Sequence, residues 1–216
     1  MSGIANSAVG ALHGKLVLGR RASVLAGWFA ELAPKDARIL DVGCGDGMLA
    51  ARLMSLRPDL SIDGVDVLVR EGTHIPVREF DGSVLPFDDG SYDAVMFSDV
   101  LHHTEDPMVL QREAHRVARG HVLIKDHFVK GVAAATRLRL MDWVGNARFG
   151  VSLPYNYWTE KQWRDAWERI GLHPERIVTS LGLYPEPLDH IVGAQLHFVV
   201  RLGKVSGTSR TPQPPG

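Results

Sequence analysis

Short apolar runs alternate with amphipathic segments through the middle of the chain. Five runs of strand character cover Arg38 to Val42, Ser61 to Val65, Val77 to Phe80, Ala94 to Ser98 and Val122 to Lys125. The first, fourth and fifth are almost continuously apolar, which is typical of strands covered on both faces. Apolar residues at helical spacing lie between them, notably from Met48 to Leu56 and from Met108 to Ala118. This alternation predicts an α/β fold with a mostly parallel sheet between helices.

An amphipathic helix is predicted before the first strand. Its apolar stripe comprises Leu18, Ala22, Leu25, Phe29 and Leu32. Arg20 and Arg21 in front of an apolar run also resemble an export signal, but Glu31 interrupts that run early. A packed first helix is therefore the preferred interpretation.

The last third of the chain predicts a helix followed by two strands. Thr159 as a cap and Glu160 in the first turn open the helix, and Gly171 closes it. The strands are expected at about Arg176 to Leu181 and Gln195 to Leu202. Residues 1–10 and the proline-rich residues 203–216 are too poor in apolar side chains to order themselves, so both are expected to be disordered. Residues 11–202 are expected to form a single domain, which is long enough for a sizeable core.

The run from Ile39 to Gly47 carries the strongest chemical signal. Strand-forming residues lead into Gly43, Gly45 and Gly47, and a helical segment follows directly. Glycine accepts positive φ and lacks Cβ, so such a strand-to-helix turn lets a ligand lie against the backbone. A dinucleotide-binding G-x-G-x-x-G turn would need glycine where Met48 stands, and a P-loop would need a Gly-Lys-Ser/Thr ending that the sequence lacks.

The turn resembles the first motif of class I S-adenosylmethionine-dependent methyltransferases, and further family motifs follow in order. They are Gly64-Val65-Asp66, Asp81-Gly82 with Leu85-Pro86-Phe87, Ser91-Tyr92-Asp93-Ala94-Val95, Val100-Leu101-His102-His103 with Asp106-Pro107, and Glu113 with Arg116-Val117 before the strand His121 to Asp126. The series covers roughly residues 35–127 and is similar to methyltransferases of small molecules. It implies a doubly wound, seven-stranded, mostly parallel sheet (the Rossmann-like methyltransferase fold) with an antiparallel last strand. It also implies S-adenosyl-L-methionine as the cofactor.

Open parallel sheets bind ligands beyond the carboxyl ends of their strands, and the candidate cofactor residues all follow such ends. The set comprises Asp41, Gly43, Cys44, Gly45, Asp66, Val67, Asp81, Gly82, Ser98 and Asp99. The turn offers backbone N–H groups and room for close approach. Asp41 is placed to accept from the ammonium of the methionine moiety, and Asp66 to accept from the ribose hydroxyls.

The remaining cofactor contacts follow from the resemblance. It places Asp81-Gly82 at the adenine and Ser98 to Val100 along the outer wall. Taken alone, Asp81-Gly82 is also an ordinary turn. Arg20 or Arg21 approaches the cofactor only if the first helix folds over the site; otherwise both are solvated charges.

Methyl transfer mainly requires the acceptor to be held in line with the S–CH₃ bond, because the sulfonium leaving group is already activated. Such orientation supplies on the order of 7–11 kcal/mol. An acidic acceptor also needs a base, and histidine is the obvious residue type. His102-His103 follow the fourth strand and Asp126-His127 the fifth. Adjacent residues on a helix point about 100° apart, so at most one of the histidine pair faces the site squarely.

We therefore take His103, and His127 with Asp126 as its orienting partner, as the candidate catalytic residues. No metal site is expected, because Mg²⁺ prefers a carboxylate-rich oxygen set and the sequence has no tight Asp/Asn cluster. The long connection 128–158 is expected to form the acceptor pocket or a lid over it, since its aromatic, Met and Asn side chains suit a small-molecule pocket. Arg137, Arg139 and Arg148 in it would suit an anionic acceptor or would simply be solvated.

Composition narrows the classes of partner. The formal net charge of −1 gives no electrostatic reason for nucleic-acid binding. Cys44 is the only cysteine, so no intramolecular disulfide can form and a cytoplasmic location is expected. No apolar run approaches the ~20 residues of a membrane span. The alternatives left open are a cofactor-binding module without its own activity, and transfer to O, N or C of the acceptor; Met48 disfavours a nicotinamide-dependent oxidoreductase. The acceptor and the oligomeric state are not predicted.

Overall fold

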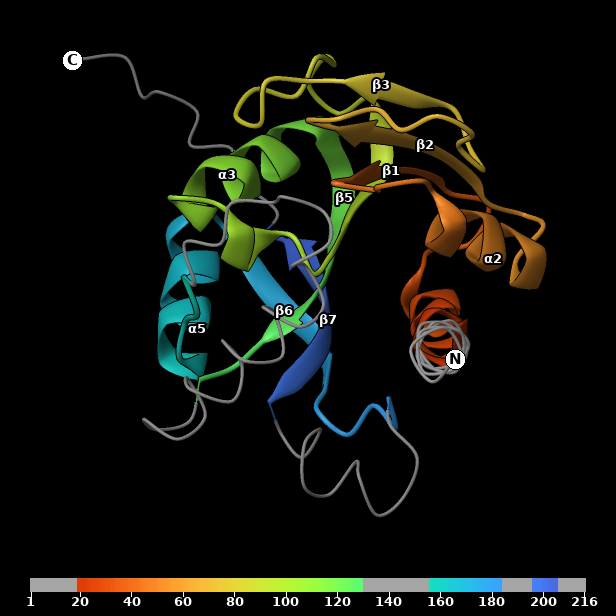
Figure 1. Cartoon of the computed structure of the whole chain (residues 1–216). Coiled ribbons are helices and arrows are strands. Elements are labelled where there is room, and N and C mark those ends of the chain that lie inside the picture. The colour runs from red at the N-terminus through yellow and green to blue at the C-terminus, as the bar shows by residue number, and fades with distance from the viewer. Residues whose placement is uncertain (1–18, 130–155, 184–195, 206–216) are drawn as a thin grey trace, which may run out of the picture.

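The computed structural model describes residues 19–129, 156–183 and 196–205 (Figure 1). Seven strands in these ranges form one sheet in the order β3-β2-β1-β4-β5-β7-β6. The strands are β1 (Arg38–Val42), β2 (Ser61–Asp66), β3 (Val77–Glu79), β4 (Tyr92–Ser98), β5 (Ala118–His127), β6 (Leu172–Val178) and β7 (His197–Lys204). The helices are one over residues 19–32, α2 (Met48–Leu56), the 3₁₀ turn η1 (Leu101–His103), α3 (Pro107–Val117) and α5 (Glu160–Arg169).

The last strand is inserted antiparallel into an otherwise parallel sheet. β1 pairs in parallel with β2 and β4, β3 pairs in parallel with β2, and β5 pairs in parallel with β4. β7 lies between β5 and β6 and is antiparallel to both. The predicted doubly wound, seven-stranded sheet with an antiparallel last strand is therefore confirmed.

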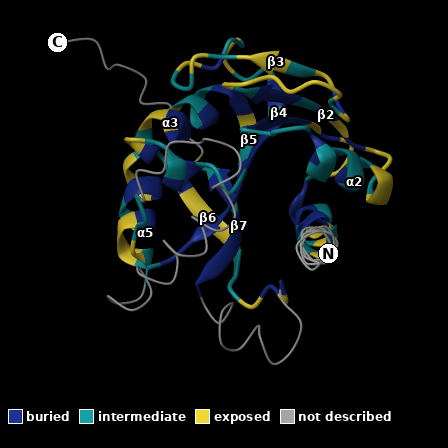
Figure 2. Ribbon diagram, in the orientation of Figure 1, coloured by how far each residue is buried: buried dark blue, intermediate teal, exposed yellow. Residues whose placement is uncertain are grey.

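Helices cover both faces of the sheet, because alternate strand residues point to opposite sides. Ile39 joins the apolar cluster formed with Phe29 of the first helix and Leu53 of α2. Leu40, the next residue of β1, joins the cluster that contains Trp163 of α5. Figure 1 shows the first helix and α2 on one side of the sheet and α3 and α5 on the other, and Figure 2 shows the buried strands between them.

Two strands begin earlier than predicted, because pairing with a neighbouring strand extends each of them beyond its apolar run. β5 begins at Ala118 rather than Val122, since Ala118 pairs with Tyr92 of β4 across an irregular register. β6 begins at Leu172 rather than Arg176 and tolerates Pro174 because it is an edge strand. The apolar pattern of the sequence alone does not predict these strand pairings.

The predicted tail begins too early. Gly203 and Lys204 belong to β7, where Gly203 pairs with His121 of β5 and Lys204 with Leu172 of β6. These backbone hydrogen bonds order residues that carry little apolar surface of their own. The expectations for residues 1–10, for residues 206–216 and for most of the 128–158 insertion fall outside the described residues.

The helix predicted at Thr159 is confirmed with its cap. The Thr159 side chain accepts from the backbone N–H of Gln162, whose side chain in turn accepts from the Thr159 N–H, so two end groups are satisfied. Gly171 follows the helix with a φ of 74°. Among the described residues, no helix is long and apolar enough to cross a membrane.

The strand order reverses between β1 and β4. β1 lies between β2 on one side and β4 on the other, so Val42 is level with Val65 and with Phe97. The chain segments that leave β1 and β4 therefore diverge from the same edge. Ligands in open α/β sheets bind in the crevice at this switch point.

Candidate functional site

The glycine turn after β1 is built so that side chains are excluded from it. Gly43, Gly45 and Gly47 have φ values of 72°, 61° and 76°. A Cβ on Gly43 would lie 2.6 Å from the Cγ2 of Val100, and one on Gly47 would lie 2.4 Å from the Cγ1 of Ile75. Both positions therefore require glycine for space as well as for conformation.

We expected the turn to offer its backbone N–H groups to a ligand, but three of them donate within the protein. Gly43 and Cys44 donate to the carbonyl of Val65 at 2.8 and 3.2 Å. Gly45 donates to Oδ2 of Asp66 at 2.7 Å. Three N–H groups of the turn are thus used to join it to the end of β2, so the turn provides close approach rather than a row of unused donors.

Two carboxylates converge at this turn. Asp41 on β1 is buried, and that burial, reinforced by the charge of Asp66, raises the pKa of Asp41 to about 7. Asp66 is half-buried and also accepts from the backbone N–H of Leu68 at 3.1 Å. Because the charge of Asp66 disfavours ionisation of Asp41, the pair favours a ligand that brings positive charge beside it.

Asp81 and Gly82 form a turn beside an apolar edge. Oδ1 of Asp81 accepts from the backbone N–H groups of Ser83 and Val84, both at 2.8 Å, and these bonds lower the pKa of Asp81. Val67 is 57% exposed, and its Cγ1 would lie 3.1 Å from a Cβ on Gly82. Val67 and Gly82, which the sequence analysis placed in the cofactor site on separate grounds, are therefore neighbours in space. Together they offer a surface on which a flat ligand ring can lie.

A charged cluster closes the end of β4. Asp99, which follows Ser98, has a φ of 60°, and its side chain pairs with Lys125 of β5 and, at 2.7 Å, with Arg21 of the first helix. Burial alone would raise the pKa of Asp99, but Arg21 and Lys125 hold it well below its usual value. Burial lowers the pKa of Lys125 to about 8. Arg21, and not the exposed Arg20, thus joins the first helix to the site edge.

Asp126 organises the histidines at the end of β5. Its Oδ1 lies 2.7 Å from Nδ1 of His102 and 3.3 Å from Nδ1 of His127. Burial would raise the pKa of Asp126, but the two imidazoles lower it, so the carboxylate stays ionised. Burial and then the nearby Lys125 lower the pKa of His127 to about 4, which keeps its ring neutral at neutral pH.

The rings of this region pack on one another. The ring centroid of His102 lies 4.8 Å from the ring centroid of His127, 4.0 Å from that of His103 and 5.6 Å from that of Tyr157. His197 of β7 lies 4.7 Å from His127, to which it is also the strand partner. We call His102, His127, His197 and Asp126 the histidine cluster.

The sequence did not single out three members of this site. His102 rather than His103 reaches Asp126, whereas His103 is half-buried and its ring lies against that of His102 at an interplanar angle of 46°. The sequence did carry a signal for Lys125, because it is a charged residue at the end of an apolar run. Its side chain is fully buried. His197 had only its place at the start of the last strand. The tertiary contacts were needed to assign all three.

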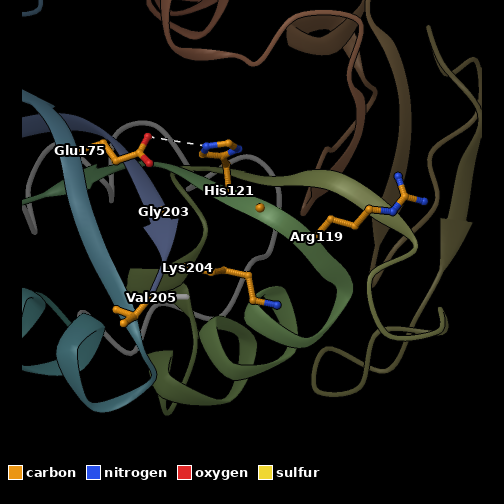
Figure 3. Close-up of a pocket in the computed structure, with 7 residues that line it drawn as sticks. Arg119, His121, Glu175, Gly203, Lys204 and Val205 are labelled. Carbon is orange, nitrogen blue, oxygen red and sulfur yellow. Dashed lines mark ion pairs between the residues drawn. The ribbon is translucent and has the colours of Figure 1, made fainter. Parts of the chain in front are cut away.

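The pocket drawn in Figure 3 lies at the opposite edge of the sheet, where β5 begins and β7 ends. It has a volume of about 400 Å³. Its charged groups are engaged with the protein: Glu175 lies 3.7 Å from Nε2 of His121, and Nζ of Lys204 donates to the carbonyl of Ala118 at 3.0 Å. The candidate site is therefore placed at the switch point and not in this pocket.

Comparisons with known proteins identify the family and the fold. A family model described as a methyltransferase domain matches residues 17–176. The 27-O-demethylrifamycin SV methyltransferase of Amycolatopsis mediterranei (strain S699) is 26% identical over an alignment of 213 residues, gaps included. The match covers 81% of this chain and 73% of that protein. An uncharacterized methyltransferase of Mycobacterium tuberculosis (strain ATCC 25618 / H37Rv) is 34% identical over 114 residues, covering 49% of this chain and 58% of that protein. The chain therefore spans little more than half the length of that relative.

A solved structure has the same fold. The 1,6-didemethyltoxoflavin-N1-methyltransferase of Burkholderia thailandensis, with bound 1,6-didemethyltoxoflavin and S-adenosylhomocysteine, superposes with a TM-score of 0.60 at 17% identity. The match covers 86% of this chain and 77% of that chain. At this identity the likeness concerns the fold alone.

Proposed function

This chain belongs to the class I S-adenosylmethionine-dependent methyltransferases, and we propose that it transfers the methyl group of S-adenosylmethionine to a small-molecule acceptor. The observation that carries this proposal is the glycine turn flanked by Asp41 and Asp66 at the switch point. The named substrates of two similar proteins, 27-O-demethylrifamycin SV and 1,6-didemethyltoxoflavin, are small molecules, which supports the acceptor class.

The residues at the switch point fit this cofactor. When bound, S-adenosylmethionine supplies a methyl group on a positively charged sulfonium, which leaves as a neutral thioether. Asp41 faces the turn as a buried carboxylate, and a cationic ammonium beside it would favour its ionised form. Asp66 would accept from the ribose hydroxyls with lone pairs beyond those used by Gly45 and Leu68.

The outer part of the cofactor would lie between two further segments. Val67 and Gly82 offer an apolar edge for the adenine, with Asp81 as an acceptor beside it. The backbone of Ser98 and Asp99 would line the opposite wall, because the Asp99 side chain is already turned toward Lys125. Cys44 fits the turn as a small side chain that packs against Gly64, where a Cβ would lie 2.5 Å from its Sγ.

The histidine cluster would face the acceptor. Methyl transfer needs the acceptor's nucleophilic atom held in line with the methyl group, and rigid buried side chains do this best. We assign this orienting duty to His127, with Asp126 as the residue that fixes its ring through Nδ1. His103, half-buried beside the cluster, is the candidate base that takes up the proton lost by an acceptor hydroxyl.

The test is calorimetric titration of S-adenosylhomocysteine followed by assays of methyl transfer to a panel of metabolites. Asp66→Ala should weaken binding of S-adenosylhomocysteine at least about tenfold, because a charge-assisted ribose contact is worth roughly 1.5–3 kcal/mol. Asp88→Ala, which changes an exposed aspartate in the loop before β4, is the matched control and should bind as the unaltered chain does. An unchanged dissociation constant in Asp66→Ala would remove Asp66 from the cofactor site.

The acceptor-side assignment has its own readout. His127→Ala and His103→Ala should lower the rate of methyl transfer while leaving the affinity for S-adenosylhomocysteine within about twofold, since neither side chain is among the proposed cofactor contacts. Loss of cofactor binding in both variants would contradict their placement on the acceptor side. We place the reaction in the cytoplasm, supported by the free thiol of Cys44.

A further inference from the structure

Three side chains outside the proposed cofactor contacts converge at the ends of β4 and β5. Asp99, His102 and His127 each bring one donor atom to a region in which these atoms all lie within 4.8 Å of one another. They come from three segments, the end of β4, the turn η1 and the end of β5. Both histidines are buried, so water does not compete freely for this region.

A fourth residue, Asp126, contacts one ring nitrogen of each imidazole. Oδ1 of Asp126 lies 2.7 Å from Nδ1 of His102 and 3.3 Å from Nδ1 of His127. A neutral imidazole that donates from Nδ1 to this carboxylate carries its lone pair on Nε2. The Nε2 of His127 lies 3.8 Å from Oδ1 of Asp99. Metal-bound histidines are commonly fixed in this way by a carboxylate on the other ring nitrogen.

We propose that Asp99, His102 and His127 bind a divalent late first-row metal ion of the Zn²⁺ class, with Asp126 as the orienting residue behind both histidines. Two imidazoles and one carboxylate are a donor set that Zn²⁺, Co²⁺, Ni²⁺ or Fe²⁺ accepts. The expectation of no metal was based on Mg²⁺, which prefers oxygen ligands. A nitrogen-rich set is not subject to that objection, and the sequence alone did not bring His102 into it.

Lys125 is the resident cation of this site. Its ammonium is fully buried and pairs with Oδ1 of Asp99, the same oxygen that faces His127. Arg21 holds the other oxygen of Asp99 at 2.7 Å. The chain without metal thus already places positive charge where the donors converge. A divalent ion must displace the Lys125 ammonium from Asp99, and the two cations therefore compete.

This inference deepens the proposed function, on which the following role rests. A metal at this point would lie on the acceptor side and would polarise an acceptor oxygen as a Lewis acid. His103 lies outside the donor set and keeps its proposed duty as base. The binding of the metal itself is measured without methyl transfer and does not depend on that role.

The test uses the full chain without a histidine tag, stripped with a chelator and titrated with Co²⁺ and Zn²⁺. Co²⁺ should give the visible ligand-field absorption of a four- or five-coordinate ion with one equivalent bound, and Zn²⁺ should abolish it by displacement. Affinities come from calorimetry. Absence of these bands in the unaltered chain would overturn the proposal whatever the variants do.

The variants separate this site from surface histidines. Asp126→Asn should weaken Co²⁺ binding about 10–100-fold, and His127→Asn should weaken it at least as much. His173→Asn, at an exposed histidine of β6, is the matched control and should bind Co²⁺ unchanged. Lys125→Met should tighten binding, because it removes the competing cation. Equal affinities in the unaltered chain and in His127→Asn would overturn the assignment, as would weaker binding in a folded Lys125→Met variant.

Titration of S-adenosylhomocysteine into the same samples separates the two proposals. Cofactor binding without Co²⁺ binding would reject the metal site and leave the proposed function standing. Co²⁺ binding without cofactor binding would do the reverse.

Discussion

Three carboxylates at the ends of neighbouring strands behave differently because different groups face them. Burial and the charge of Asp66 raise the pKa of Asp41 to about 7. Arg21 and Lys125 outweigh burial at Asp99 and hold its pKa well below the usual value. At Asp126 the same outcome comes from two imidazoles. The residue type and its place at a strand end are thus alike in all three, and the neighbours decide which one is poised to change its charge.

Asp41→Asn should change the pH dependence of stability. A carboxyl whose pKa is raised in the folded state, here from 3.8 to about 7, contributes stability at low pH that is lost as the pH rises through the folded-state value. The free energy of unfolding of the unaltered chain should therefore fall between about pH 4 and pH 7 by an amount that the variant lacks.

Thermal unfolding at about pH 5 and about pH 8 measures this difference. The melting temperature of Asp41→Asn relative to the unaltered chain should be higher at the upper pH than at the lower one. The same variant should bind S-adenosylhomocysteine more weakly. A pH-independent difference in melting temperature would show that Asp41 ionises normally in the folded chain.

Gly43→Ala should be strongly destabilising, and Gly72→Ala is its matched control. Both glycines have a φ of 72°, but a Cβ on Gly72 meets nothing within 4 Å, whereas one on Gly43 meets Val100 at 2.6 Å. Positive φ alone costs roughly 1–2 kcal/mol, and the added overpacking should cost Gly43→Ala about 1–3 kcal/mol more. Urea unfolding measures both. Equal losses would mean that Val100 moves aside freely.

At the scale of elements, β5 carries most of the site. It is the longest strand described, and its end supplies Lys125, Asp126 and His127 in succession. Trp163 of α5 donates to the carbonyl of His127 at 3.0 Å and so fixes the strand end from one face. On the other side of the sheet, Arg21 ties the first helix to Asp99. Two helices from opposite ends of the chain therefore hold one pair of strand ends in place.

Gly27→Ala should stabilise the first helix and with it the site edge. Gly27 is exposed within the helical residues 19–32, and a Cβ there meets nothing within 4 Å. Glycine in a helix interior costs roughly 0.5–1 kcal/mol relative to alanine, so the free energy of unfolding should rise by about that amount. Ala30→Gly, the reverse change in the same helix, should lower it by at least as much, because Ala30 also packs against the apolar core. A loss of stability in Gly27→Ala would indicate that this stretch is not helical in solution.

At the scale of the whole molecule, the doubly wound order places the residues proposed to contact the cofactor and the acceptor on one edge. The reversal of strand order between β1 and β4 brings the glycine turn beside Asp99. The antiparallel entry of β7 brings His197 level with His127, although the two are far apart in sequence. The site is thus formed by segments that are far apart in the sequence, from the glycine turn after β1 to His197 at the start of β7.

S-adenosylhomocysteine should stabilise the whole domain, because a ligand that binds only the folded chain shifts the unfolding equilibrium. At about 100 times the dissociation constant the gain is about 2.7 kcal/mol. For a domain of this size that gain corresponds to a rise in melting temperature of roughly 5–10 °C. Differential scanning fluorimetry measures it, with NAD as the control that should produce no shift. A shift with NAD and none with S-adenosylhomocysteine would contradict the family's cofactor at this turn.

The amino-acid sequence by itself determined the features that depend on nearby residues. Apolar runs predicted all five parallel strands before residue 128, the spacing of the glycines predicted the turn, and Asp41 and Asp66 could be placed because each stands at the end of a predicted strand. These signals are local: they follow from backbone conformation and side-chain periodicity within a few residues.

Only the tertiary structure decided which of His102 and His103 faces Asp126, which cations hold Asp99, and that His197 lies beside His127. Neighbouring residues of one helical turn point in different directions, and the docking of η1 on β5 selects between them. The partner of a buried charge is likewise set by strand order and register. Those depend on contacts between segments far apart in the chain, which a single sequence does not display.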